Sequence, residues 1–342
     1  MILAEGQFGE VGSKTALGVL RYGSDQVVGI LDSTQAGRNV RDWLGPPYDI
    51  PVLATLDETM EHRPTALLIG IAPAGGKLPD AWRAVVRGAI DQGLDVISGL
   101  HTFLGDDPEL AAAAAAAGVE LIDHRRPPTR REVATGRPHA PGKRVILTVG
   151  TDCALGKMSV ALELRAAAIA AGLGATFVPT GQTGIMIEGW GVAVDGVVSD
   201  FLQGTTEWLV EQGEARGDWV FVEGQGSLAH PAYSSVTLGL IHGSTPDAMV
   251  MVHQPGRKQP HGWEGSRFGL PELCSFIDLH ERIAALVRPS EVAAVALNTS
   301  LLDEGAARRQ IAQVAAETGL VTDDPVRFGG ERLLDGLRER LS

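Results

Sequence analysis

The sequence predicts an α/β protein with two domains, each built on a parallel sheet. A chain of 342 residues exceeds the usual size of one domain. Short apolar runs without polar alternation recur along it, which is typical of strands buried on both faces of a parallel sheet. Helical patterns separate these runs, as the crossover connections between parallel strands require.

The first predicted domain covers residues 1–124. Its apolar runs lie at 26–34, 65–73, 94–100 and 118–124. An amphipathic helix is predicted between the second and third runs, ending at Gly93, and an alanine-rich helix between the third and fourth. For that second helix, Asp106 or Asp107 can cap the start, Pro108 suits the first turn and Gly118 ends it. Loops at 32–38 and 72–76 follow strands, where ligands of such sheets bind.

A glycine-rich stretch near the start, "GQFGEVGSKTALG" (6–18), also contains Gly-Ser-Lys-Thr. The apolar segment before it, residues 1–5, is barely long enough for a strand. We interpret the stretch as the first turn of the domain, with Lys14 near a cleft. A second nucleotide-binding loop is the alternative.

A linker is predicted at residues 125–142. The surrounding stretch 123–144 contains four prolines and seven Lys or Arg residues, without apolar periodicity. Its charge indicates either a solvated strap or the lining of an anion site between the domains.

The second predicted domain covers residues 143–342. It opens with a strand at 144–150 and a helix at 157–171 that stops at Gly172. Further strand and loop units are expected at 175–184, 218–228, 247–256 and 292–300, with a closing helix at 331–340.

Composition limits the possible partners. A net charge of −13 disfavours nucleic acid and anionic membrane surfaces as general partners. The two cysteines, Cys153 and Cys274, are far apart in sequence, which indicates a reducing compartment. No apolar run approaches the ~18 residues of a transmembrane helix, and the first residues lack a signal-peptide pattern. We therefore expect a cytoplasmic protein with a small-molecule substrate, and a homo-oligomer is possible.

The strongest motif is "VGTDCALGKMSVALEL" (149–164), a strand followed by a glycine-rich turn and a helix. Backbone N–H groups at such a helix start form an anion cradle, to which a lysine adds a positive charge. The motif therefore predicts a phosphate-binding loop. Its residues are Gly150, Thr151, Asp152, Cys153, Ala154, Leu155, Gly156, Lys157, Met158 and Ser159.

This loop departs from the usual G-x-x-x-x-G-K-[ST] pattern in two ways. Five residues separate Gly150 from Gly156, as in dethiobiotin synthetase-like proteins. Met158 stands where a Ser or Thr hydroxyl would bind Mg²⁺, and a thioether is a poor ligand for that ion. Ser159 lies about 100° further around the helix and cannot simply replace the hydroxyl.

Polar residues at other strand ends complete the candidate site. Glu223 ends an apolar strand, where it faces the phosphates or caps the next turn. His230 and His253 follow two strands, and each is a candidate base that titrates near neutral pH. Arg257 and Lys258 are candidates to bind carboxylates. A glycine-rich loop at 179–191 contributes Gln182, Thr183 and Glu188 for hydrogen bonds to substrate.

No metal site is predicted. The histidines and the two remote cysteines match no usual zinc spacing.

Together, the motifs resemble a known family over nearly the whole chain. They are "AEGQFGEVGSKTA", "DSTQAGR", "IGIAPAGGKLP", "GLHTFLGDDPEL", "GTDCALGKMSVALEL", "PTGQTGIMI", "FVEGQGSLAHP" and "HQPGRK". The family is that of the D-glutamate N-acetyltransferases, formerly a family of unknown function. The resemblance implies a Rossmann-like N-terminal domain and a P-loop C-terminal domain similar to dethiobiotin synthetase.

The resemblance also implies acetyl transfer from acetyl-CoA to the amine of D-glutamate, in amino-acid catabolism. Coenzyme A carries phosphates that need binding but no hydrolysis, so a loop with Lys157 and without a Mg²⁺ hydroxyl would suffice. Glu223, His230 or His253 would deprotonate the amine. The main alternative is an ATP-dependent ligase or kinase with Mg²⁺ beside Glu223 and Asp152. A non-catalytic nucleotide sensor or scaffold is the third hypothesis.

Overall fold

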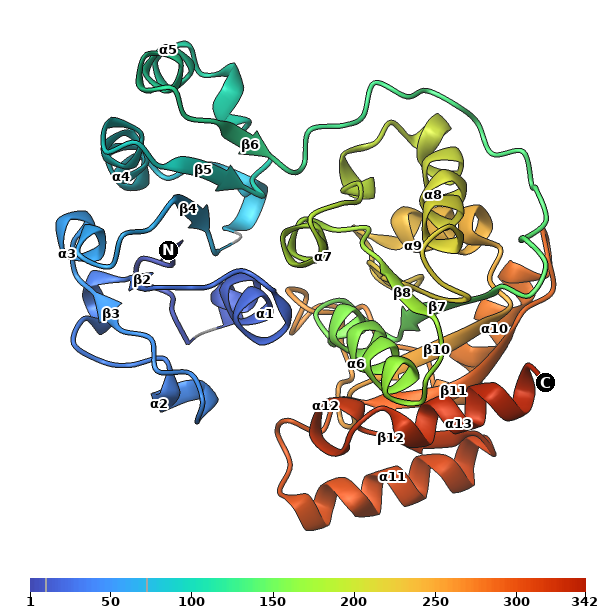
Figure 1. Ribbon diagram of the computed structural model, residues 1–342. Helices are drawn as coiled ribbons and strands as arrows, with labels where there is room; N and C mark the ends of the chain where they lie inside the picture. Colours follow the sequence, from blue (N-terminus) through green and yellow to red (C-terminus); the bar gives the residue numbers. More distant parts are fainter. Residues whose placement is uncertain (10, 72) are drawn as a thin grey trace. The chain divides into compact units, whose positions relative to one another are not determined.

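The computed structural model describes residues 1–9, 11–71 and 73–342. The chain forms two compact units (Figure 1). Unit 1 comprises Met1–Pro127 and Ile185–Gly196, and unit 2 comprises Pro128–Gly184 and Val197–Ser342. Ala72 of the predicted loop 72–76 and Glu10 of the glycine-rich stretch 6–18 lie outside the described residues.

Unit 1 contains a six-stranded sheet in the order β3-β2-β1-β4-β5-β6, with every pair parallel. This order is that of a Rossmann-type doubly wound sheet, so the predicted α/β class with a parallel N-terminal sheet is confirmed. The strands are β1 (Ile2–Leu3), β2 (Ile30–Leu31), β3 (Val52–Leu53), β4 (Ala66–Ile69), β5 (Asp95–Ser98) and β6 (Leu121–Asp123). The α-helices are α1 (Lys14–Tyr22), α2 (Arg41–Leu44), α3 (Leu56–Met60), α4 (Asp80–Asp91) and α5 (Pro108–Ala117).

Local sequence explains the ends of α5. Asp107 accepts hydrogen bonds from the backbone N–H groups of Glu109 and Leu110, and Pro108 occupies the first turn. Gly118 adopts the left-handed conformation that ends the helix. Asp107, rather than Asp106, is therefore the cap, and both predicted ends of this helix are confirmed.

Unit 2 contains a second parallel sheet in the order β12-β11-β10-β7-β9-β8. Its strands are β7 (Arg144–Gly150), β8 (Ala175–Val178), β9 (Trp219–Val222), β10 (Ala248–His253), β11 (Glu291–Leu297) and β12 (Val321–Asp323). Its helices are α6 (Lys157–Ala170), α8 (Ser199–Glu214), α9 (Ser234–Ser244), α10 (Leu273–Ala284), α11 (Glu304–Thr318), α12 (Pro325–Phe328) and α13 (Glu331–Arg340). The phosphate-loop strand β7 lies between β9 and β10, so the loops after all three strands meet at one sheet edge.

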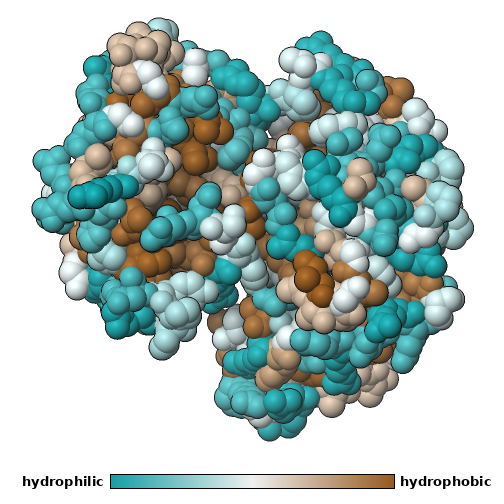
Figure 2. All heavy atoms as spheres, in the orientation of Figure 1, coloured by the Kyte–Doolittle hydropathy of each residue, from teal (hydrophilic) through white to brown (hydrophobic). Residues whose placement is uncertain are grey.

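Helices cover both faces of this second sheet. In Figure 1, α6, α12 and α13 pack together on one face, and α8, α9 and α10 lie on the other. Strands β7 and β10 are buried along almost their whole length, which explains their unalternating apolar sequences. The visible face of unit 2 is mostly hydrophilic, with small scattered hydrophobic groups (Figure 2).

One predicted loop is a helix. The "PTGQTGIMIEGWG" stretch was expected to be a glycine-rich loop, but Gln182–Glu188 forms α7. Gly184, the third residue of this helix, is needed for close packing and not for a flexible turn. A Cβ atom on Gly184 would lie 2.6 Å from the Glu223 carboxylate.

Among the described residues, no helix combines the length and the apolar character that crossing a bilayer requires.

Gly224 tests how closely the loop after β9 packs on β7. A Cβ atom at this position would lie 1.6 Å from the carbonyl oxygen of Thr148, so the backbone must move in Gly224→Ala. We expect this variant to lose about 1–3 kcal/mol of unfolding free energy in urea denaturation followed by circular dichroism.

Gly174→Ala is the matched control, because its nearest new contact would be at 3.5 Å. It should change the unfolding free energy by less than about 1 kcal/mol. An equal loss in both variants would contradict the close packing of Gly224.

Candidate functional site

The predicted phosphate loop has the geometry of an anion cradle. It joins β7 to α6, and Ala154 (φ 53°) and Gly156 (φ 101°) have the positive φ angles that are common in anion-binding loops. The side chain of Lys157 is only 6% exposed and folds back over the loop. Its Nζ donates to the carbonyl oxygen of Asp152 at 2.7 Å. The loop can therefore offer both amides and a buried ammonium to a phosphate.

Asp152 holds this loop to the loop after β10. Its fully buried carboxylate accepts from the Arg257 guanidinium at 2.9 Å and from the backbone N–H of His261 at 2.8 Å, both through Oδ2. The same guanidinium donates to the carbonyl oxygen of Cys153 at 3.0 Å. Arg257 is thus fixed beside the phosphate loop, while the neighbouring Lys258 is exposed.

The loop after β9 contacts the loop after β10 through His230. This histidine is 1% exposed, and its ring stacks on Tyr233 at 4.7 Å between centroids. Its Nδ1 accepts from the backbone N–H of Ala232 at 3.2 Å, so Nε2 is the protonated nitrogen and donates to the His261 carbonyl oxygen at 3.1 Å. With both nitrogens in use, His230 positions the loops and has no free lone pair to act as a base.

Glu223 binds the loop after β8. Its Oε2 accepts from the backbone N–H groups of Thr180 at 2.8 Å and Gly181 at 3.0 Å, just before α7. These partners precede Glu223 in the chain, so the contact is not the predicted cap of the turn that follows this residue, and a role beside the phosphates stays a prediction. Gln182 and Thr183, predicted to bind substrate, are the first two residues of α7.

His253, at the end of β10, differs from the other predicted histidine. Its Nδ1 lies 3.1 Å from the hydroxyl of Thr151 in the phosphate loop. Its Nε2 makes no hydrogen bond to the described residues. Burial lowers the pKa of His253 to about 4. The imidazole is therefore neutral at pH 7, with the phosphate loop beside it.

One cluster could in principle hold a metal ion. Asp152, Cys153 and His230 offer ligand atoms that all lie within 4.8 Å of one another. Oδ1 of Asp152 is buried without a hydrogen-bond partner among the described residues. Oδ2 is bound to Arg257, however, and His230 would have to give up one of its two hydrogen bonds to become a ligand. The donor set is thus poorly prepared for a cation, and the adjacent guanidinium disfavours one.

Sequence reasoning missed the contacts that assemble these loops. Asp152 is separated from Arg257 by 105 positions and from His261 by 109. Asn298, after β11, donates to the carbonyl oxygen of Leu155 at 3.0 Å from a position 143 residues away. Ser227 donates to the Thr151 carbonyl oxygen at 3.0 Å. No motif spacing encodes such pairs, although "NTS" and "GQGS" at strand ends marked the loops that make them.

Comparisons with known proteins agree with this architecture. Residues 132–334 match a family model described as a domain of unknown function (DUF1611_C), P-loop domain, and residues 33–127 match DUF1611_N, Rossmann-like domain. A D-glutamate N-acetyltransferase from Tritonibacter scottomollicae is 37% identical over 95% of this chain and 94% of its own length. Another from a Pseudoalteromonas species is 36% identical over 79% of this chain and 80% of its own.

A solved structure is also similar. The crystal structure of a DUF1611 family protein from Anabaena variabilis has a TM-score of 0.92 and 38% identity, and the match covers 99% of both chains.

The pKa of His253 predicts a pH-dependent stability. In the unfolded chain a histidine binds its proton near pH 6.5, whereas in the folded protein this one does so only near pH 4. Unfolding therefore takes up a proton between these values, and the contribution of the neutral ring is complete above pH 6.5 and lost as the pH falls toward 4. Between pH 6.5 and pH 4, the unfolding free energy of His253→Gln should depend less on pH than that of the wild type. The two slopes should differ by about 1.4 kcal/mol per pH unit.

Urea denaturation at half-unit steps from pH 7 to pH 4 measures both slopes. The exposed His62 provides the control, and His62→Gln should retain the wild-type slope. A wild-type slope in His253→Gln would show that the ring titrates alike in both states.

Proposed function

The chain belongs to the DUF1611 family and is an N-acetyltransferase, and we propose that it transfers an acetyl group from acetyl-CoA to the amine of D-glutamate. The observation that carries this proposal is the likeness, over 95% of the chain, to a relative with that name. In the reaction, the amine lone pair attacks the thioester carbonyl carbon. The C–S bond breaks, the CoA thiol leaves and an amide forms.

The phosphate loop would bind the phosphates of acetyl-CoA. Its amides and the Lys157 ammonium are suited to anions, and coenzyme A requires only that its phosphates be held. Met158 supports this assignment, because the loop lacks the hydroxyl oxygen that would bind Mg²⁺ for hydrolysis.

The carboxylates of the amino acid would be bound near the loop after β10. Arg257 uses one nitrogen, NH1, for Asp152 and Cys153, which leaves its other N–H groups available for a carboxylate. Lys258 is exposed next to it, and Gln182 and Thr183 at the start of α7 are the other proposed contacts.

We assign the proton acceptor to His253. An ammonium group has no lone pair, so it must lose a proton before attack. The ring of His253 is neutral at pH 7. In the proposed tautomer, Nδ1–H donates to the Thr151 hydroxyl, and the lone pair of Nε2 accepts the proton. The hydrogen bonds of Glu223 and His230 support a positioning role for these two residues in the proposed reaction.

The alternative function is that of an ATP-dependent ligase or kinase. It is favoured by the phosphate loop itself and by the carboxylate on the strand next to β7. Against it stand Met158 and the commitment of Glu223 Oε2 to two backbone amides.

We further propose that the enzyme acts in D-amino-acid catabolism in the cytoplasm as a homo-oligomer, with an amino acid as its substrate and without nucleic acid or membrane partners.

Acetyl transfer can be tested by incubating the protein with D-glutamate and acetyl-CoA without ATP. We expect release of free thiol that depends on the amino acid. Lys157→Ala removes the buried ammonium and should raise the KM for acetyl-CoA at least tenfold, because a charge-assisted hydrogen bond is lost.

Arg282→Ala is the control for this test, because it removes a cation that is 77% exposed on α10. Its kinetics should match the wild type. Formation of ADP with ATP and Mg²⁺, without thiol release, would instead establish the ligase or kinase alternative.

Met158→Thr restores the missing hydroxyl. If the loop only holds phosphates, calorimetry should give an affinity for CoA within about threefold of wild type. This corresponds to a change of less than about 1 kcal/mol in the binding free energy. Little ATP hydrolysis should appear. A large gain of Mg·ATP turnover would show that the loop is a weakened hydrolase.

A further inference from the structure

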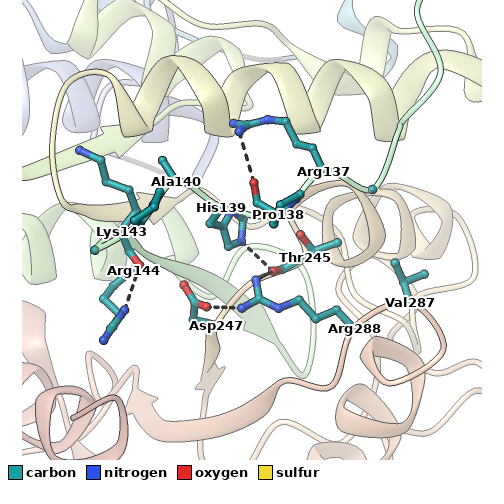
Figure 3. Close-up of a pocket in the computed structure, with 13 residues that line it drawn as sticks. Arg137, Pro138, His139, Ala140, Lys143, Arg144, Thr245, Asp247, Val287 and Arg288 are labelled. Atoms are coloured by element: carbon teal, nitrogen blue, oxygen red, sulfur yellow. Dashed lines mark hydrogen bonds and ion pairs between the residues drawn. The ribbon is translucent and has the colours of Figure 1, made fainter.

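The linker forms one wall of a cavity that the reaction does not use. The cavity has a volume of about 480 Å³, within the range of small-molecule sites. Its lining comes from residues 136–144, from Thr245 and Asp247 before β10, and from Val287 and Arg288 before β11 (Figure 3). All of these residues belong to unit 2.

This cavity lies at the opposite sheet edge from the phosphate loop. Arg144 begins β7 and Gly150 ends it. At the usual rise of a strand, the two ends are about 20 Å apart. The cavity is therefore a separate site, and its occupation does not depend on acetyl transfer.

The cavity lining is rich in cations, although Arg137 and Lys143 are paired with the carboxylates of Glu214 and Asp218 next to it. The chain has a net charge of −13, yet the lining has four residues that are cationic at neutral pH and one carboxylate. The cations are Arg137, Lys143, Arg144 and Arg288, and the carboxylate is Asp247. Figure 3 shows Lys143 and Arg144 on one side of the cavity and Arg288 on the other. A ligand with two negative groups could contact both sides.

Buried contacts hold the linker wall in place. Glu214, which is 4% exposed on α8, accepts from Arg137 at 2.7 Å and from Nδ1 of His139 at 2.9 Å. Nε2 of His139 lies 2.9 Å from the carbonyl oxygen of Thr245. The ring of His139 lies between α8 and the segment before β10. Residues 137–140 of the linker are thus docked on unit 2, whereas residues 129–136 are exposed, as the prediction of a solvated strap expects.

Two donors in the wall are incompletely used. Arg144 has no carboxylate partner among the described residues, and its one hydrogen bond goes to the Lys143 carbonyl oxygen at 3.2 Å. Nε of Arg137 is buried and lacks a hydrogen-bond partner among the described residues. That Nε is covered by protein atoms, so the unpaired guanidinium of Arg144 is the donor that an anion in the cavity could reach. Arg288 is paired with Asp247 at 2.6 Å and Lys143 with Asp218 at 2.8 Å.

We propose that this cavity binds a small organic anion that carries two negative charges as carboxylate or phosphate groups. The ligand would accept from Arg144 on the linker wall and approach Arg288 across the cavity. Binding would stabilise the docked linker.

Calorimetry on the full chain at low ionic strength tests this site, with glutarate as the dicarboxylate probe and inorganic phosphate as the phosphate probe. At least one probe should bind, and the stronger one identifies the ligand chemistry. In Arg144→Gln the dissociation constant should rise at least tenfold, because a charge-assisted contact is lost. Lys157→Ala should leave this binding unchanged and so separates the cavity from the phosphate loop.

Arg282→Gln is the control, since it removes an exposed cation outside the cavity. Thermal unfolding checks that each variant is folded, and Lys143→Gln replaces Arg144→Gln if the latter unfolds. The proposal is wrong if neither probe binds, or if binding is lost in Lys157→Ala and retained in the linker variant.

Discussion

The buried carboxylate of Asp152 is the interaction on which the rest of the candidate site depends. A carboxylate that is removed from water is costly unless charged and polar partners replace the water, and Arg257 and the His261 amide do so here. This contact joins the loop after β7 to the loop after β10. Through the His261 carbonyl, His230 then adds the loop after β9. Three loops from separate parts of the sequence thereby become one rigid surface.

That surface combines a loop suited to phosphates with a neutral imidazole. Lys157 supplies a buried positive charge without a metal-binding hydroxyl behind it, and His253 stays unprotonated because it is buried. Both features suit the proposed transfer between a phosphate-bearing donor and an amine. They suit ATP hydrolysis less well, because that reaction needs a cation next to the phosphates.

Both ends of β7 carry groups suited to anions in an acidic protein. At its carboxyl end, the loop offers backbone amides and one lysine. At its amino end, the docked linker gathers arginines around a cavity. Local concentration of cations is how a molecule with a net charge of −13 can attract anions at chosen places.

The sequence by itself determined the α/β class, the elements with strong local patterns and the phosphate loop. Each of these depends on neighbouring residues, as the cap of α5 by Asp107 shows. The glycine-rich pattern gave a wrong prediction of a loop where α7 forms. Gly184 is needed there for close packing against Glu223. Only the tertiary structure decided that Asp152 binds Arg257 and His261, that His230 has no free nitrogen and that the linker encloses a cavity. These contacts join residues far apart in the chain, and their energies exist only once the sheets have brought those residues together.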